Sequence, residues 1–298
     1  MQWVLISNLP KNYNGDVYQN PLNNILLSIS QRDNEYKNPT WLTFNRAKKE
    51  GGMIKLDQES TCIYGTFMKY KVGDKFYDLK RIPQNKEGKG KRIPCFSPNW
   101  LYNVEQFDWE SLPQKYNIKT FQNKEVETSK VTETIESHLS HYFKKHKVIV
   151  KHEGTRACYY KGTDTIFIPE KKAFYTPEKY ASTLAHEAIH STGHKMRLDR
   201  LGNQNKDESY SKEEFVAELG SNFMLHQLNI PYDKEDWDQT VSYIKGWISK
   251  LEQDEKLFIE TDKKARKAIG LINSAIPKKK SKEELKVILK EVGRKTWE

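Results

Sequence analysis

Two histidines and a glutamate past the middle of the chain have the residue types and spacing that metal-assisted hydrolysis requires. His186 and His190 are four residues apart, and Glu187 directly follows the first. On a helix the two imidazoles lie one turn apart on one face, where both can meet a single cation at about 2.0–2.1 Å. Glu187 could then take a proton from bound water, whose pKa Zn²⁺ lowers to roughly 7. The pattern predicts a metallopeptidase-type site for Zn²⁺, with Mn²⁺ or Co²⁺ as other suitable ions, rather than two surface histidines.

A catalytic metal site of this kind also needs a third protein ligand. The metzincin pattern is excluded, because it requires a histidine at the position of Met196. In the gluzincin arrangement, which this chain resembles, a ligand glutamate precedes a second acid by four residues. That resemblance implies Glu214 as the ligand and Glu218 as the carboxylate that orients His186. An alternative is that Ser211 and Glu214 form a capping box, which would leave Glu218 as the ligand.

Local signals place the histidine motif on a helix within a mixed α and β region. Thr176 and Pro177 predict the start of this helix, as N-cap and first-turn proline, and Gly193 predicts its end. Short apolar or alternating runs before it predict a small sheet, and later periodic runs predict further helices. The predicted strands are 148–150, 157–160 and 165–168, with a hairpin turn at 162–164, and the other predicted helices are 132–145, 211–228, 236–251 and 254–276.

The first part of the chain predicts a second α and β unit. It holds 18 of the 35 aromatic residues, which can supply a core of its own. The predicted elements are helices at 22–29 and from Thr43 to Gly51, strands at 61–70, 76–82 and 95–104, an exposed loop at 85–92 and a polar linker at 109–130. We therefore expect an α+β fold with two domains, residues 1–125 and 126–276, followed by a Lys-rich tail at 277–298.

A basic and aromatic segment in the first unit suggests contact with single-stranded nucleic acid. Residues 69–92 hold nine Lys or Arg against three acidic residues. Basic groups can track phosphates while aromatic rings stack on bases, which is what sequence-tolerant binding of single strands needs. The alternative is a hairpin with a solvated charged face and a buried aromatic face. The interleaved aromatic residues are Tyr64, Phe67, Tyr70, Phe76 and Tyr77.

Composition favours a soluble protein with a polyanionic partner. The formal net charge is +10, which raises the expectation of nucleic acid as that partner. Three distant cysteines, Cys62, Cys95 and Cys158, predict no disulfide framework and fit a reducing compartment. The chain shows neither a signal-peptide pattern nor an apolar run of membrane-spanning length. The expected location is the cytoplasm, with no membrane contact, and a secreted degradative protease is disfavoured.

Longer motifs resemble the ArdC antirestriction proteins of conjugative plasmids and other mobile elements. In the second half these motifs are Tyr180–His194 and Glu213–Gly220, and in the first half Asn38–Phe44 and Asn103–Gln106. The resemblance implies an N-terminal single-stranded-DNA-binding domain, a C-terminal zincin-like metallopeptidase domain, and protection of incoming DNA from host restriction. Leu56–Ser60 departs from the basic, Gly-containing turn of the family, which weakens the expectation of DNA contact there.

The resemblance also defines the expected partners, which are single-stranded DNA and a protein substrate that the sequence does not identify. An alternative function is protection of DNA by occupancy alone, with a structural or vestigial metal site and no proteolysis. For the oxyanion of peptide hydrolysis, the candidate donors are Tyr159, Tyr160 and Tyr175. The expected DNA-binding residues are Trp41, Lys69, Lys71, Lys80, Arg81, Lys89, Lys91 and Arg92.

Overall fold

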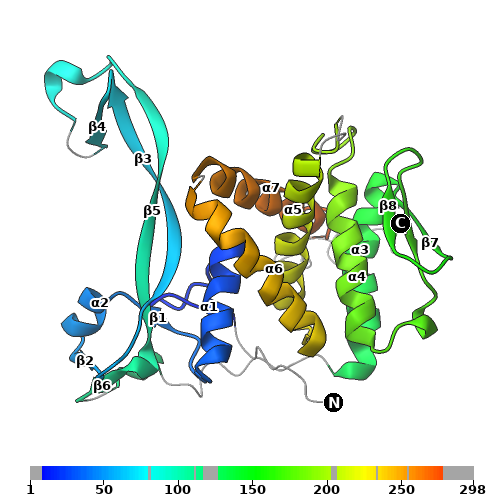
Figure 1. Ribbon diagram of the computed structural model, residues 1–298, viewed down its shortest axis with the longest axis horizontal. Coiled ribbons are helices and arrows are strands. Elements are labelled where there is room, and N and C mark those ends of the chain that lie inside the picture. The colour runs from blue at the N-terminus through cyan, green and yellow to red at the C-terminus, as the bar shows by residue number, and fades with distance from the viewer. Residues whose placement is uncertain are drawn as a thin grey trace, which may run out of the picture.

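Three parts of the molecule follow one another across Figure 1: a long ribbon of strands on the left, a body of helices in the middle and a small sheet at the right edge. This mixture of helices and separate sheets confirms the predicted α+β class. The computed structural model describes residues 9–79, 82–110, 112–116, 127–202, 207–232, 234–253 and 255–277. Lys80, Arg81, residues 117–126 of the expected linker and the tail from 278 onward lie outside the described residues.

The first part of the chain is a mixed unit whose longest feature is an extended strand ribbon. Its helices are α1 (Pro21–Asp33) and α2 (Phe44–Lys49), and its strands are β1 (Trp41–Leu42), β2 (Gly52–Ile54), β3 (Thr61–Val72), β4 (Lys75–Asp78), β5 (Lys91–Asn103) and β6 (Phe107–Trp109). Strands β1, β5, β3 and β4 form one antiparallel sheet in this order, and β2 pairs with β6. We call β3, β4 and β5 the arm, because they extend away from the helices (Figure 1).

The loop expected at 85–92 is shorter than predicted, because Lys91 and Arg92 already belong to β5. Gly90 allows this early return to the sheet. Its N–H donates to Tyr70 Oη at 2.8 Å, and a Cβ at this position would lie 2.3 Å from the carbonyl oxygen of Lys71. A larger residue could not approach β3 so closely, and two of the predicted basic residues are therefore held in paired strand rather than in a loop.

The second part of the chain carries a three-stranded sheet and a set of helices. Its elements are α3 (Val131–His146), β7 (Ile149–His152), β8 (Cys158–Tyr160), β9 (Thr165–Ile168), α4 (Pro177–Thr192), α5 (Asp207–Gln227), α6 (Lys234–Gln253) and α7 (Glu255–Asn273). The strand order is β7, β9, β8, with β7 parallel and β8 antiparallel to β9. The hairpin predicted before the metal helix is thus confirmed, and β8 is an edge strand of this sheet.

Helix α4 begins and ends where its local sequence predicts. The hydroxyl of Thr176 accepts from the backbone N–H of Lys179 at 3.1 Å, Pro177 is the first helical residue, and Gly193 follows the last. A second glycine sets how closely α4 meets α5. A Cβ at Gly220 would lie 2.9 Å from Ile189, so only glycine lets the two helices approach at this point. That close approach brings the acids of α5 next to the histidines of α4.

Helix α1 packs into the core of the second part, although the sequence places it in the first domain. Its buried residues Leu22, Ile25 and Ile29 share one apolar cluster with α4, α5 and α7. At the same contact Asn24 Oδ1 lies 2.9 Å from Nδ1 of His226, and burial lowers the pKa of His226 to about 4. A neutral imidazole therefore joins α1 to α5 at physiological pH, and the domain ranges divide the sequence without separating two independent cores.

Trp41 is a core residue, which corrects its expected role in DNA binding. Its side chain is 1% exposed and packs with Leu27, Ile63 and Leu101. Tyr36 meets the indole edge-on, with ring centroids 6.0 Å apart. A ring enclosed in this way has no face free to stack on a base. Trp41 instead packs between α1 and the ends of β3 and β5 that lie nearest the helices.

A buried aspartate on α7 predicts an unusual dependence of stability on pH. Asp262 is 1% exposed, and burial raises its pKa to about 6 although Arg266 lies 2.6 Å away. The folded state therefore favours the protonated acid. The contribution of Asp262 to the free energy of unfolding is fully present below pH 4 and is lost as pH rises through 6. At neutral pH the deprotonated acid costs about 2–3 kcal/mol.

We expect Asp262→Asn to raise the midpoint of thermal unfolding at pH 7 to 8 and to change it little below pH 4. The matched control is Asp108→Asn, which alters an exposed aspartate on β6. Calorimetry across this pH range measures both variants. An equal shift at pH 4 and pH 8 would contradict the protonation argument.

Candidate metal centre

Three side chains from two helices converge on one point. Nε2 of His186 lies 3.1 Å from Nε2 of His190, and both nitrogens face the carboxylate of Glu214 at 3.3 and 3.4 Å. One donor atom from each residue lies within 4.8 Å of the others. Two imidazole nitrogens and a carboxylate oxygen are the donor set of catalytic zinc sites, and this spacing can close around one ion. Among the residues described, no other group of three acids, histidines or cysteines could do so.

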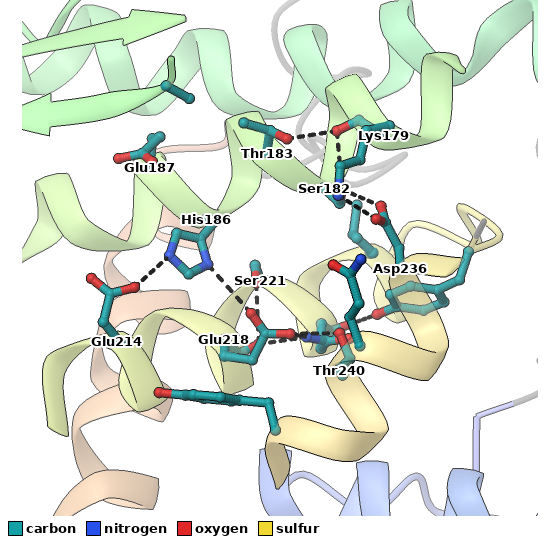
Figure 2. Close-up of a pocket in the computed structure, with 16 residues that line it drawn as sticks. Lys179, Ser182, Thr183, His186, Glu187, Glu214, Glu218, Ser221, Asp236 and Thr240 are labelled. Atoms are coloured by element: carbon teal, nitrogen blue, oxygen red, sulfur yellow. Dashed lines mark hydrogen bonds and ion pairs between the residues drawn. The ribbon is translucent and has the colours of Figure 1, made fainter. Parts of the chain in front are cut away.

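The structure distinguishes the two glutamates proposed as the third ligand. Ser211 lies inside α5, which begins at Asp207, so it is not an N-cap and the capping-box alternative is wrong. Glu214 faces the two Nε2 atoms, whereas Glu218 faces the far side of the first ring, 3.5 Å from Nδ1 of His186 (Figure 2). Glu218 also accepts from Thr240 Oγ1 at 2.6 Å. It therefore occupies the orienting position that the gluzincin resemblance implied.

Sequence reasoning missed a second acid that faces one of the two imidazoles. Oε1 of Glu213 lies 3.5 Å from Nδ1 of His190, so each imidazole has a carboxylate behind it. Glu213 in turn forms an ion pair with Arg200. The adjacency of Glu213 and Glu214 was a usable signal, because neighbouring helix residues point about 100° apart and can reach two rings. The contribution of Arg200 had no signal, since it depends on how the loop after α4 returns.

Glu187 lies beside the converging imidazoles and is 8% exposed. Burial raises its pKa, and this effect outweighs the opposite influence of the two histidines and of the backbone N–H of Tyr159, which donates to the carboxylate. A carboxylate with a raised pKa accepts a proton more readily near neutral pH, as a general base must. Glu187 thus lies where a general base would be needed, and its role stays a prediction.

Two cavities meet at this centre, one of about 610 Å³ and one of about 360 Å³. Both are lined by Ala157, His186, Glu187 and Glu214. The larger one extends to α6, where Asp236, Gln239, Thr240 and Tyr243 line it, and Figure 2 labels Asp236 and Thr240 among its lining side chains. The smaller lies against β8 and is lined further by Cys158, Tyr159, Lys161, His190, Leu201 and Glu213. An extended chain could therefore pass the metal position with residues on both sides.

The tyrosines suggested as oxyanion donors do not serve that role in this geometry. The hydroxyl of Tyr159 donates to Asp164 at 2.7 Å. Tyr175 is 98% exposed, and neither it nor Tyr160 lines either cavity. Tyr243 on α6 does line the larger cavity, and the sequence offered no signal for it, since its position depends on how α6 packs across α5.

The arm gathers most of the predicted basic residues that the structure describes. Lys71 pairs with Lys91 and Tyr70 pairs with Arg92 across β3 and β5, while Lys69 lies opposite Ile93. Lys89 is exposed in the turn before β5. Two of the expected stacking residues, Tyr64 and Tyr70, are buried, whereas Phe76 and the unexpected Trp100 are 49% and 57% exposed.

Metal binding at this centre should release protons. Burial lowers the pKa of His186, but Glu214 and Glu218 outweigh it and raise this pKa to about 10; the pKa of His190 is also raised, by Glu213 and Glu214. A cation must displace these protons, so its apparent affinity should fall up to tenfold per displaced proton for each pH unit below these pKa values. Titration calorimetry in buffers of different ionisation enthalpy measures the released protons. Equal heats in all buffers would contradict the prediction.

Two known protein families match this chain, each over one of its parts. The N-terminal domain of the anti-restriction factor ArdC matches residues 2–102, and a zincin-like metallopeptidase family matches residues 137–264. No described helix combines the length and apolar character needed to cross a membrane.

Two crystal structures of the antirestriction ArdC protein from the R388 plasmid share this architecture. The metal-free structure has a TM-score of 0.63 and 24% sequence identity, and the Mn(II)-bound structure has a TM-score of 0.61 and 25% identity. In both comparisons the match covers 90% of this chain and 88% of the other.

Longer proteins contain related sequence as well. Two DNA primases TraC of Escherichia coli are 28% and 30% identical over 228 and 225 residues. These matches cover 74% and 73% of this chain but only 20% and 14% of the primases. An uncharacterised protein of Sinorhizobium fredii, y4eC, is 30% identical over 118 residues, which is 39% of this chain and 38% of that protein. The chain thus spans a fifth or less of the primases that it matches.

Proposed function

We propose that this chain is an antirestriction protein of the ArdC type, which binds single-stranded DNA with its first domain and carries a zinc peptidase-type site in its second. The observation that carries the enzymatic part is the convergence of His186, His190 and Glu214 beside the buried Glu187. The antirestriction role would then be exerted in the cytoplasm on DNA entering the cell.

The residues of the site divide the work of peptide hydrolysis between them. His186, His190 and Glu214 would hold Zn²⁺, which when bound acts as a Lewis acid and lowers the pKa of its water. Glu187 would be the general base that takes a proton from a water held there and returns it to the leaving amine. A scissile peptide would lie where the two cavities meet, with the segments on either side of it in the larger and the smaller cavity.

The arm supplies the features that sequence-tolerant binding of single strands requires. Lys69, Lys71, Lys89, Lys91 and Arg92 would track phosphates, and Lys80 and Arg81 remain expected contacts from their sequence position. The exposed rings of Phe76 and Trp100 offer faces for stacking in place of Trp41. Double-stranded DNA would gain no stacking from these rings, which favours single strands.

Binding of a fluorescent oligonucleotide to the full chain should weaken steeply with salt. Replacing Lys71, Lys89 and Lys91 together with glutamine should reduce the slope of log affinity against log salt by about 2, at roughly 0.7 for each lost phosphate contact. The control replaces the exposed Lys144, Lys151 and Lys172 in the second domain. Fluorescence anisotropy at several salt concentrations measures both, and identical slopes for the two variants would reject the arm as the binding surface.

A further inference from the structure

Behind His190 the structure places a buried ion pair that the proposed chemistry has not used. Arg200 Nη2 donates to Glu213 Oε1 at 2.7 Å, and Arg200 Nε donates to Glu213 Oε2 at 3.1 Å. The side chains are 5% and 6% exposed. Glu213 Oε1 is also the atom that lies 3.5 Å from His190 Nδ1. The two-pronged contact fixes both the position and the plane of the carboxylate that faces the ring.

The same guanidinium also holds the end of the metal helix. Arg200 lies in the loop that follows α4, and it donates to the carbonyl oxygen of Ile189 at 2.9 Å and to Thr192 Oγ1 at 2.8 Å. These partners flank His190 in sequence and belong to the last turn of α4. A cation at this end is favoured by the unpaired carbonyl groups of the helix. One side chain thus fixes the backbone that carries His190 and the acid that faces it.

The support of His186 is different in kind. Its carboxylate partner, Glu218, is held by neutral donors, with Thr240 Oγ1 at 2.6 Å and Asn222 Nδ2 at 2.9 Å, and Figure 2 shows Thr240 and Glu218 in this contact. Stability alone does not explain the use of an ion pair behind the second histidine. A buried pair loses so much hydration that well-packed apolar residues are often as stable or more stable.

We infer that Glu213 and Arg200 are a positioning pair for His190. Glu213 accepts the Nδ1 proton and thereby leaves Nε2, with its lone pair, directed at the ion position, while Arg200 fixes Glu213 and the last turn of α4 together. This inference rests on the proposed metal site, because the orientation of the ring matters only if Nε2 binds an ion. Arg200 lines neither cavity, and Glu213 faces Nδ1 of the ring rather than the ion position, so both act through the histidine.

Metal affinity tests the inference in the full-length protein. A chromophoric chelator competes for Zn²⁺ with the wild type, Glu213→Leu, Glu213→Gln and the control Glu260→Gln, which alters an exposed glutamate on α7. We expect Glu213→Leu to lose 10- to 100-fold in affinity. Glu213→Gln should recover most of it, because its amide oxygen can still accept from Nδ1. The visible absorption spectrum of the Co²⁺-loaded protein should shift for Glu213→Leu and remain unchanged for the control.

The thermal unfolding of metal-free protein separates positioning from a loss of fold. If Glu213→Leu fails to fold, Arg200→Lys serves instead, because it keeps the charge but loses the two-pronged contact. Arg200→Lys should lose Zn²⁺ affinity, and its unfolding midpoint should fall no further than that of Glu213→Gln. Wild-type affinity in a folded Glu213→Leu or Arg200→Lys protein would overturn the inference. A wild type that binds no Zn²⁺ would instead overturn the proposed metal site itself.

Discussion

Replacing Glu187 with glutamine should lower the rate of peptide hydrolysis by roughly two to four orders of magnitude while the bound metal and the fold persist. Glutamine has the same shape as glutamate but cannot accept a proton from water, and general-base catalysis contributes typically 10²- to 10⁴-fold. The ligand donors on His186, His190 and Glu214 are unchanged, so metal content should stay near that of the wild type. Cleavage of an unstructured protein such as casein measures activity, and elemental analysis measures the metal.

The same variant distinguishes proteolysis from protection by occupancy. The control is Glu136→Gln, which alters a half-buried carboxylate on α3 that pairs with Lys171, accepts from Tyr180 Oη and lies outside both cavities. Transfer of unmodified DNA into a restricting host then measures antirestriction by each protein. Loss of protection in Glu187→Gln alone supports a proteolytic mechanism. Full protection without cleavage supports occupancy, and retained cleavage would show that Glu187 is not the base.

The parts of the site that were predictable from sequence are those set by neighbouring residues. Helix α4 begins at Pro177 and ends before Gly193 because capping and backbone freedom act within a few residues. His186 and His190 share a face for the same local reason. The α+β class followed likewise from short alternating runs and longer periodic ones, and these patterns do not depend on how the elements pack.

What was missed or left open depends on contacts between distant segments. The resemblance implied Glu214 as the ligand, but Glu218 remained an alternative, because the residue that faces both rings is set by the crossing of α4 and α5, which Gly220 and Ile189 hold at close range. Trp41 resembled a stacking residue because a tryptophan beside a polar motif has no local sign of burial; only the packing of α1 against the arm encloses it. Placing a domain boundary at residue 125 likewise gave no indication that α1 packs on α5.

The arrangement also suggests how the two parts could influence each other. Arg32 of α1 bonds Asp238 of α6 at 3.0 Å, and Thr240, two residues further on, bonds Glu218 behind His186. Helix α6 therefore contacts the first domain on one side and lines the larger cavity on the other. This continuous packing means that variants of the arm should be tested in the full chain, where α1 keeps its partners.

Replacing His186 with alanine should remove the metal altogether. One of three protein ligands is lost, which exceeds the roughly 10- to 100-fold effect expected for an outer partner. Because a ligand that binds only the folded state stabilises it by about 2.7 kcal/mol at 100 times its dissociation constant, Zn²⁺ should raise the unfolding midpoint of the chelator-treated wild type. It should leave that of His186→Ala unchanged, and elemental analysis should fall from about one ion per chain to none.

The control for this variant is His141→Ala, an exposed histidine on α3 that should behave as the wild type does. The comparison matters because histidines on a protein surface can bind Zn²⁺ weakly without forming a site. Stabilisation by Zn²⁺ that survives in His186→Ala but disappears in His141→Ala would place the ion elsewhere. The convergence of the two imidazoles and Glu214 would then be a structural contact, with the carboxylates of α5 serving only to balance protonated histidines.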